Sequence, residues 1–212
     1  PVKAAHPFEN RDERLLATVL MNGVLFKGKR IATYPGGADA MPNPNATKTG
    51  YYLRKFLNEN VNIQTGGGSD GHVVPLFRLA EIYLNYAEAL NEYDPTNPDI
   101  AVYLNKIRER VSLPDVPSGL TQEQMRTLIH HERRVELAFE EHRFWDVRRW
   151  KVASSTLGAP VKGVKITQDD AGNFTYSPVQ VEQRVFQPKM YWYPIPQSEV
   201  LKLHHWEQNK GW

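Results

Sequence analysis

The stretch TQEQMRTLIHHERRVELAFEEHRFWDVRRW, residues 121–150, decides the fold because it joins the start of a helix to a dense run of charge. Thr121 can serve as the N-cap residue, and Gln124, three residues later, can reach back to complete a capping box. Aromatic and apolar side chains then recur at spacings of seven, four and three residues, at Leu128, Val135, Phe139 and His142. This is a helical period, so the sequence predicts a helix that begins at residue 121 and runs out towards Gly158.

A row of like charges follows one face of this helix. Glu132, Glu136 and Glu140 are separated by four residues each, and such a row gives an isolated helix no stability. The row therefore needs cationic partners on a neighbouring element, and we expect ion pairs between helices that fix their register. The residues assigned to this structural network are Arg78, Glu81, Glu88, Glu132, Arg133, Glu136, Arg143 and Asp146.

Two further helices are expected upstream of this stretch. PLFRLAEIYLNYAEALNEY (75–93) is apolar around most of its girth, which predicts a helix packed on several sides, with Pro75 in its first turn. Asn97-Pro98-Asp99 starts a second helix, 97–112, whose inner stripe is Ile100, Leu104, Ile107 and Val111. The short connection between the two helices predicts an antiparallel pair of the tetratricopeptide sort.

The first fifty residues have the composition of strands and turns. LLATVLM (15–21) is a strand candidate, Asn22-Gly23 is a strong hairpin-turn signal, and VLF (24–26) would form the returning strand. Residues 35–50 are rich in Gly and Pro, which predicts irregular structure.

The remaining segments give weaker local signals. TGGGSDG (65–71) is expected to be a flexible link. VKGVKIT (161–167) and FTYSPVQV (174–181), separated by the turn residues 168–173, predict a second hairpin. A last short helix is expected at about 198–204.

Composition excludes several classes of protein. The 212 residues contain 26 Lys plus Arg against 24 Asp plus Glu, for a net charge of +2, which argues against nucleic acid as the main partner. Cysteine is absent, so there is no disulfide, no thiolate nucleophile and no cysteine metal site. No apolar run approaches the ~20 residues of a membrane span. The chain starts at Pro1, and we expect it to be part of a longer protein.

Several strings carry a family resemblance. ERRVELAFEEHRFWDVRRW (132–150) resembles the C-terminal signature of the SusD/RagB family, the starch-utilisation-type nutrient-binding lipoproteins of Gram-negative bacteria. Other strings that resemble the family, in the family's order, are NRDERLLATVL (10–20), GYYLRKF (50–56), RLAEIYLNYAEAL (78–90), YLNKIRERVSLP (103–114) and the closing segment 185–212. Glu13 and Lys210 depart from the pattern, because each stands where Pro is usual.

The resemblance implies a mainly α fold, in which tetratricopeptide-like helical hairpins are combined with irregular loops and short β-hairpins. Residues 1–212 would be the C-terminal portion of a SusD/RagB-like domain, divided into a loop-rich first part (1–74), a helical core (75–157) and a closing segment (158–212). The implied function is to bind a glycan or another nutrient at the cell surface and hand it to a SusC-like TonB-dependent transporter. The implied location is the outer membrane, through an N-terminal lipid anchor upstream of this sequence, and no cofactor is implied.

Two other functions compete with this one. The helical hairpin at 75–112 is also typical of a tetratricopeptide-like protein-interaction module without a small-molecule ligand. A glycoside-cleaving enzyme would need two isolated carboxylates with separated pKa values, whereas the acids here lie among arginines that favour the ionised form. We therefore assign no catalytic residue. His142 and Asp146, four residues apart, are weak candidates for metal ligands, and we assign no metal site.

Ligand-binding candidates come from the loops. Saccharide sites combine aromatic faces with side chains that bond hydroxyl groups, and loops commonly carry them. Tyr34 lies beside a polar turn that contains Asp39 and Asn43, so these three residues are the predicted ligand contacts.

Overall fold

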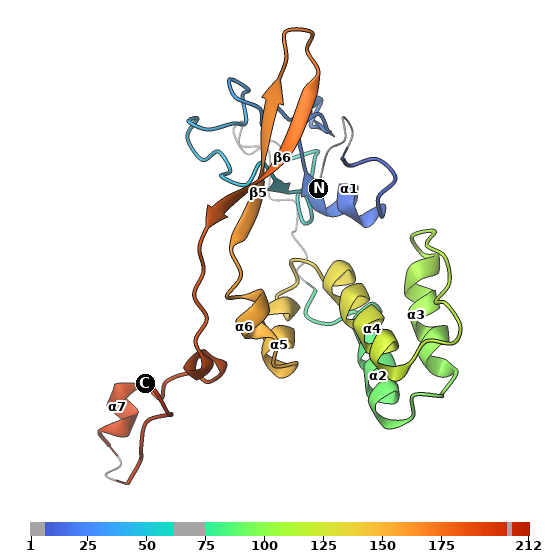
Figure 1. The fold of residues 1–212 in the computed structure, drawn as a ribbon, viewed down its shortest axis with the longest axis vertical. Helices are drawn as coiled ribbons and strands as arrows, with labels where there is room; N and C mark the ends of the chain where they lie inside the picture. Colours follow the sequence, from blue (N-terminus) through green and yellow to red (C-terminus); the bar gives the residue numbers. More distant parts are fainter. Residues whose placement is uncertain (1–6, 62–74, 203–204) are drawn as a thin grey trace.

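The computed structural model describes residues 7–61, 75–202 and 205–212. Figure 1 shows an upper part, built from the N-terminal segment and a long β-hairpin, above a bundle of helices. The C-terminal segment descends from the hairpin beside α5 and α6. The fold is mainly helical, as the sequence predicts. The expected link at 65–71 lies outside the described residues.

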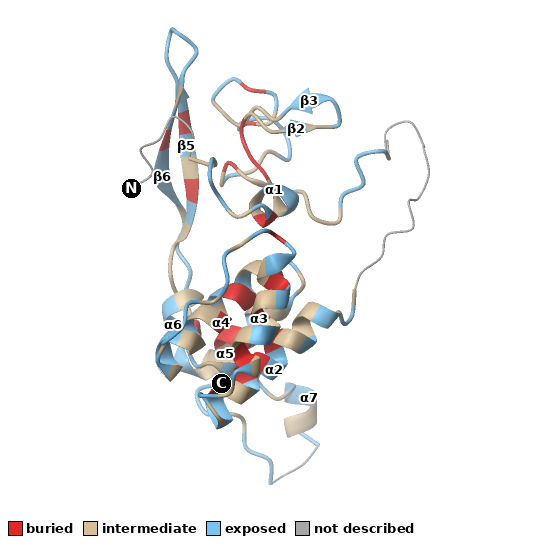
Figure 2. Ribbon diagram, turned by 90° about the vertical axis from the view of Figure 1, so that its right-hand side faces the viewer, coloured by how far each residue is buried: buried red, intermediate tan, exposed pale blue. Residues whose placement is uncertain are grey.

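The core of the bundle is formed by α2 (Leu79–Tyr93), α3 (Asp99–Glu109) and α4 (Gln122–Glu136). Figure 2 shows the buried residues concentrated where these helices meet. The buried cluster contains Leu84, Ala87, Ile100, Leu104, Ile107, Ile129 and Leu137. The predicted inner stripe of α3 is thereby confirmed, and Val111 just beyond the helix is also buried.

The predicted start of α4 is also confirmed. The Thr121 hydroxyl accepts a hydrogen bond from the Gln124 amide at 3.2 Å, and the Gln124 side chain accepts one from the Thr121 amide at 2.9 Å. This reciprocal capping box satisfies two backbone donors that the first turn of a helix leaves unpaired.

The predicted continuation of this helix to Trp150 is wrong. Helix α4 ends at Glu136, and the chain turns before α5 (His142–Arg149) and α6 (Ala153–Thr156). Phe139 and Glu141 adopt left-handed backbone conformations, with φ of 62° and 65°. The physical reason lies in tertiary contacts: Lys55 donates a hydrogen bond to the Ala138 carbonyl at 2.9 Å, and the turn carries Glu140 towards Arg78.

Helix α2 starts four residues later than predicted, at Leu79 and not at Pro75. The backbone of Arg78 is extended, and its guanidinium reaches Glu136 and Glu140. The expectation that this helix packs on several sides is confirmed in part, because α2 packs against both α3 and α4. One face remains largely exposed: Leu79, Ile82, Tyr86 and Tyr93 lie along it, and of these the Tyr86 ring packs edge-on against Tyr103 of α3.

The N-terminal part differs from the predicted hairpin around Asn22-Gly23. The expected strand at 15–21 is mostly the helix α1 (Arg14–Thr18), and β1 (Val19–Leu20) pairs antiparallel with the distant β4 (Tyr52–Leu53). The local hairpin instead joins β2 (Leu25–Phe26) to β3 (Lys29–Arg30).

Turn chemistry explains this shift of the hairpin. The turn residues Lys27 and Gly28 both have positive φ, as the favoured two-residue hairpin turn requires. The predicted turn at Asn22-Gly23 does form, since the Val24 amide donates to the Met21 carbonyl at 3.1 Å, but it does not join paired strands. The buried Asn22 side chain accepts a hydrogen bond from the Thr33 amide and donates one to the Tyr176 hydroxyl at 3.2 Å. Residues 35–50 contain neither helix nor strand, as predicted.

The second predicted hairpin is confirmed. Strands β5 (Val161–Gln168) and β6 (Phe174–Glu182) pair antiparallel, with Val164 opposite Pro178. The C-terminal segment contains the short 3-10 helix η2 (Pro188–Tyr191) and α7 (Gln197–Val200). The last helix is shorter than the predicted 198–204, of which residues 203–204 lie outside the described chain.

The hairpin is joined to the N-terminal part by a close backbone approach. Val164 donates a hydrogen bond to the Thr49 carbonyl at 2.9 Å. A Cβ atom on the neighbouring Gly163 would lie 2.7 Å from both Cα and the carbonyl oxygen of Thr49. Only glycine fits at this position, because both colliding atoms belong to the backbone.

We predict that Gly163→Ala lowers the free energy of unfolding by about 1–3 kcal/mol, because the added methyl group must displace the backbone at Thr49. The measurement is urea denaturation followed by circular dichroism. Thr175→Ala, at an exposed position of β6, is the matched control and should change the stability much less. Equal effects of the two substitutions would contradict the close approach.

Candidate functional site

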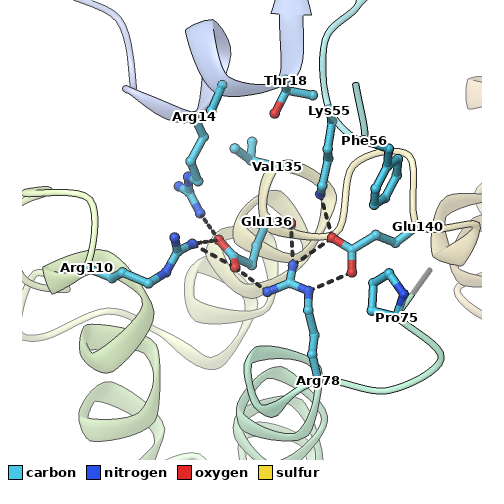
Figure 3. Close-up of a pocket in the computed structure, with 11 residues that line it drawn as sticks. Arg14, Thr18, Lys55, Phe56, Pro75, Arg78, Arg110, Val135, Glu136 and Glu140 are labelled. Atoms are coloured by element: carbon cyan, nitrogen blue, oxygen red, sulfur yellow. Dashed lines mark hydrogen bonds and ion pairs between the residues drawn. The ribbon is translucent and has the colours of Figure 1, made fainter. Parts of the chain in front are cut away.

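The buried carboxylate of Glu136 lies at the junction between the N-terminal part and the helix bundle. Its side chain is 1% exposed. It accepts hydrogen bonds from Arg14 at 2.9 Å, from Arg78 at 2.6 Å and from Arg110 at 2.8 Å. Figure 3 shows these three guanidinium groups converging on the carboxylate from three directions. They come from α1, from the residue before α2 and from the residue after α3.

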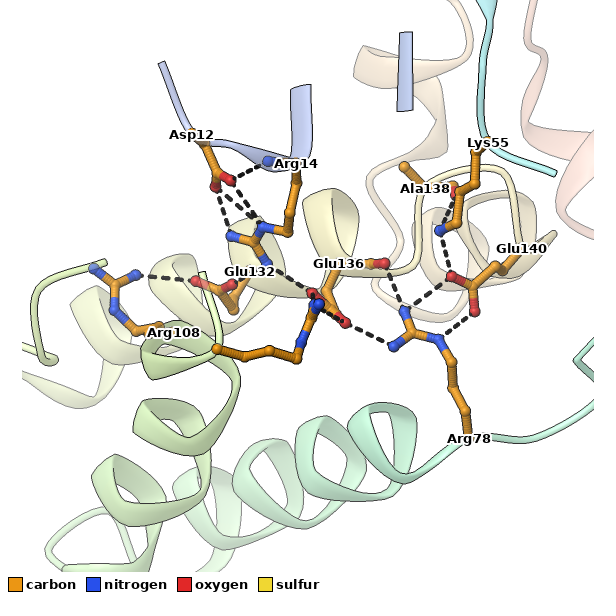
Figure 4. Close-up of polar contacts among 10 residues, drawn as sticks. Asp12, Arg14, Lys55, Arg78, Arg108, Glu132, Glu136, Ala138 and Glu140 are labelled. Carbon is orange, nitrogen blue, oxygen red and sulfur yellow. Dashed lines mark hydrogen bonds and ion pairs between the residues drawn. The ribbon is translucent and has the colours of Figure 1, made fainter. Parts of the chain in front are cut away.

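Glu132, one helical turn earlier, extends the junction. It accepts hydrogen bonds from Arg14 at 2.6 Å and from Arg108 at 3.0 Å. Arg14 also donates to Asp12 at 2.6 Å, so one guanidinium joins three carboxylates (Figure 4). Glu140 completes the row through Arg78 and Lys55. The three glutamates of the row therefore bind cations from the N-terminal part and from the ends of α2 and α3.

A second set of polar contacts runs along the seam between α2 and the pair α4 and α5. Glu88 accepts hydrogen bonds from Arg149 and from the Trp150 indole, the latter at 2.8 Å. Arg133 donates to Asn85 at 2.6 Å and to Asp146 at 2.7 Å. Two further pairs lie along this seam: Glu81 with His142, 3.7 Å apart, and the more exposed pair of Glu92 with Arg126.

The structure thus places most of the residues assigned to the network in direct ion pairs. Arg143 is the exception, because it forms no ion pair with any residue in the described part of the chain. Glu140 belongs to the glutamate row for which the sequence predicted cationic partners. Sequence reasoning did not identify the partners Asp12, Arg14, Lys55, Arg108, Arg110 and Arg149. The sequence signal that could have pointed to Arg14 was its place within residues 10–20, one of the strings that carry the family resemblance.

These contacts keep the carboxylates ionised. Burial acts to raise the pKa of Glu136, but hydrogen bonds from Arg78 and Arg14 outweigh it, so the pKa lies below its ordinary value of 4.5. The same balance lowers the pKa of Glu140, through Arg78 and Lys55, and that of Glu88, through His130 and Arg149. A general acid needs the opposite shift, so these carboxylates are suited to fixing cations and not to donating protons near neutral pH.

A cavity of about 300 Å³ adjoins Glu136 and Glu140. Its polar walls are the same groups that bind one another, among them Arg14, Arg78 and Lys55. A ligand there would have to replace ion pairs that the fold uses, so we regard this cavity as structural.

A larger cleft of about 980 Å³ lies on the other side of Arg14. Its walls come from residues 7–19, from 49–53, from α4 and from the β5–β6 hairpin. Helix α4 and the turn after it present His131, Arg134, Val135 and Ala138 to this cleft. These spacings of three and four residues define one helix face, next to the face that carries Glu132 and Glu136.

Aromatic rings and cations line the cleft together. Phe8 packs edge-on against Tyr51, with ring centroids 6.2 Å apart, and Phe139 is 58% exposed on its left-handed backbone. Such a backbone conformation is unfavourable for a bulky residue and is concentrated at functional sites. Polar and charged lining residues include Arg11, Asp12, Thr49, Tyr52, His131, Arg134 and Lys162.

The predicted ligand contacts lie elsewhere. Asp39 accepts a hydrogen bond from the Ala32 amide at 2.8 Å, and Asn43 donates to the Gly37 and Ala38 carbonyls. The Tyr34 ring packs against Phe174, with centroids 5.0 Å apart. None of the three lines the large cleft. The side chains of Asp39 and Asn43 hold the loop together. A ligand-binding role for the three residues stays a prediction.

Comparison with known proteins identifies the family. The family model described as the SusD family matches residues 2–212. The chain belongs to the SusD family. Two curated SusD-like proteins of Formosa agariphila are similar: P2 is 36% identical over 126 residues, which are 56% of this chain, and P25 is 40% identical over 106 residues, which are 48% of it.

A solved structure shares the fold over nearly the whole chain. The SusD-like protein from Bacteroides fragilis is 31% identical, and its structure matches 97% of this chain with a TM-score of 0.83. The chain spans less than half the length of these SusD-family relatives, namely 24% of P2, 19% of P25 and 40% of the Bacteroides fragilis chain. The predicted division of the chain into residues 1–74, 75–157 and 158–212 stays a proposal.

None of the helices in the described chain is long and apolar enough to cross a membrane. The described His, Asp and Glu side chains form no group of three or more that could hold a metal ion, and His142 lies 3.7 Å from Glu81.

We predict that Glu136→Gln lowers the free energy of unfolding by about 3–5 kcal/mol, because it removes a buried charge on which three guanidinium groups converge. Chemical denaturation measures this loss. Glu92→Gln is the matched control, since its partner Arg126 is on the same helix as Glu136 but the pair is exposed. A loss as large for the control would show that burial of the pair is irrelevant.

We also predict that stability falls in acid. The pKa values of Glu88, Glu136 and Glu140 are lowered in the folded chain. Their contribution to the free energy of unfolding is therefore complete above pH 4.5, the ordinary pKa of the unfolded state, and is lost as the pH falls through the folded-state pKa values. Urea denaturation from about pH 7 to about pH 3 measures the trend. The free energy of unfolding should fall less steeply with decreasing pH in Glu136→Gln than in the unchanged protein. A constant free energy of unfolding down to about pH 3 is the contrary outcome.

Proposed function

We propose that this chain belongs to a cell-surface protein that binds a saccharide nutrient in the large cleft and hands it to a TonB-dependent transporter of the outer membrane. Membership of the SusD family over residues 2–212 supports this role. A lipid anchor would hold such a protein at the outer membrane. Binding and release would need no covalent chemistry, which agrees with carboxylates that stay ionised within ion pairs.

The observation that carries the proposal is the cleft itself. Its volume of about 980 Å³ lies within the range typical of small-molecule sites. Aromatic side chains such as Tyr51 and Phe139 offer apolar surface to the carbon face of a sugar ring. Thr49, His131 and Arg134 offer hydrogen-bonding groups to its hydroxyls.

One observation favours the second candidate, a protein-interaction module. Leu79, Ile82, Tyr86 and Tyr93 form an exposed apolar stripe along α2, with exposed fractions of 62%, 51%, 41% and 90%. Contiguous apolar surface of this kind commonly marks a protein contact. Capture of a peptide partner by this stripe, with no saccharide bound by the protein, would favour the second function.

The proposed function predicts saccharide binding that depends on the cleft. A glycan array followed by calorimetry with the best oligosaccharide measures it. Phe139→Ala should weaken binding by about three- to tenfold, since a ring contact contributes about 0.5–1.5 kcal/mol. The control is Trp192→Ala, which removes a ring that is 66% exposed and does not line the cleft.

Two outcomes would contradict this proposal. Absence of binding to every oligosaccharide of the array would remove the saccharide function. Loss of binding in Trp192→Ala with none in Phe139→Ala would move the site from the cleft to the C-terminal segment.

A further inference from the structure

The cations of the cleft are partnered differently from those of the junction. Arg11, Arg134 and Lys162 line the cleft, and within residues 7–61, 75–202 and 205–212 none of them forms an ion pair. Asp12 is the one acidic side chain among the described residues of the cleft wall, and Arg14 already binds it at 2.6 Å. The open part of the cleft wall is therefore positively charged.

Helix α4 shows this difference within one element. Arg126 donates to Glu92 at 2.6 Å, and Arg133 donates to Asp146 at 2.7 Å. Arg134 follows directly in sequence, but it faces the cleft and meets no carboxylate in the described chain. The helix thus neutralises the arginines on its other faces and leaves this one available.

The electrostatic surroundings agree with an uncompensated charge. Burial, and next the like charge of Arg134, lower the pKa of Arg143, against the opposing effect of Asp146. Burial raises the pKa of Tyr51, and the positive charge of Arg11 acts in the opposite sense. Arg11 and Arg134 therefore shift the pKa values of Tyr51 and Arg143, and neither of these neighbours neutralises the arginine charge.

We propose that the cleft selects anionic saccharides, with Arg11, Arg134 and Lys162 binding the carboxylate or sulfate groups. Guanidinium groups bind such oxyanions through paired hydrogen bonds, and the ammonium of Lys162 adds a third positive charge. The rings of Tyr51 and Phe139 line the same cleft and provide surface for the sugar itself. This inference rests on the proposed function, because it names the class of saccharide that the same cleft takes.

The test compares probes that differ only in charge. Tetragalacturonate and its methyl ester form one pair, and a sulfated galactan tetrasaccharide and its desulfated form make the other. Calorimetry should show each acidic probe binding about tenfold or more tightly than its uncharged counterpart, since hydrogen bonds to charged groups are the stronger ones. Rising salt should weaken only the binding of the acidic probes. The size of the difference within each pair shows whether the carboxylate or the sulfate group is recognised, because the sugar backbone is the same within a pair.

Substitutions locate the charge preference. Arg134→Gln combined with Lys162→Gln should reduce the affinity for the acidic probe by about tenfold or more and leave the uncharged probe unaffected. Arg126→Gln, on the same helix, and Lys165→Gln, on the same strand, are the matched controls outside the cleft. Arg134 and Lys162 are exposed and outside the ion pairs, so thermal melting should verify an intact fold in the double variant.

The outcomes separate this inference from the proposed function. Equal affinity for charged and uncharged probes, with saccharide binding retained, overturns the charge preference alone. An unchanged affinity of the double variant for the acidic probe also overturns it. Failure of all four probes to bind, with an uncharged oligosaccharide of the array bound, overturns the preference alone. Absence of binding to these probes and to every oligosaccharide of the array overturns both the preference and the saccharide function.

Discussion

The fold depends on the buried carboxylates of Glu132 and Glu136. A buried carboxylate without a partner is strongly unfavourable, so folding is favourable only when the guanidinium groups arrive with it. Arg14, Arg78 and Arg110 belong to separate segments, and all three must reach Glu136 together. This requirement specifies the relative position of α1, α2, α3 and α4 more sharply than apolar packing can, because apolar contacts tolerate sliding and these hydrogen bonds do not.

Several local features of the fold were accessible from the sequence, and the long-range pairings were not. The capping box at Thr121, the buried stripe of α3 and the hairpin at 161–181 depend on neighbours within a few residues. The row of glutamates showed that cations were needed, but Arg14 lies 118 residues from Glu132, and no local period reveals such a pairing. The turn after Glu136 was missed for the same reason: it contains neither Gly nor Pro, and Lys55 holds it from a distant segment. The large cleft could not be predicted either, since its walls come from four segments.

Helix α4 connects this structural requirement to the candidate site. Glu132 and Glu136 face the arginines of the junction, whereas His131, Arg134 and Val135 face the cleft. The α-helical period therefore separates charges that adjoin in sequence and gives them different tasks. Adjacent arginines differ in the same way, because Arg133 binds Asp146 inside the bundle and Arg134 lies in the cleft wall. The sequence assigned Arg133 to the ion-pair network and gave Arg134 no role, so the place of Arg134 in the cleft wall came from the structure.

Arg14 belongs to both structures, since it binds Glu132 and Glu136 and also lines the cleft. The walls of the cleft come from the N-terminal part, from α4 and from the hairpin, and Arg14 joins the first two of these. The cleft consequently exists only while the junction is formed. A ligand that binds there binds the folded chain and not the unfolded one, so its binding free energy must add to the stability of the junction. Recognition in the cleft and the buried ion pairs are thus thermodynamically coupled, although their charged groups lie on different faces of one helix.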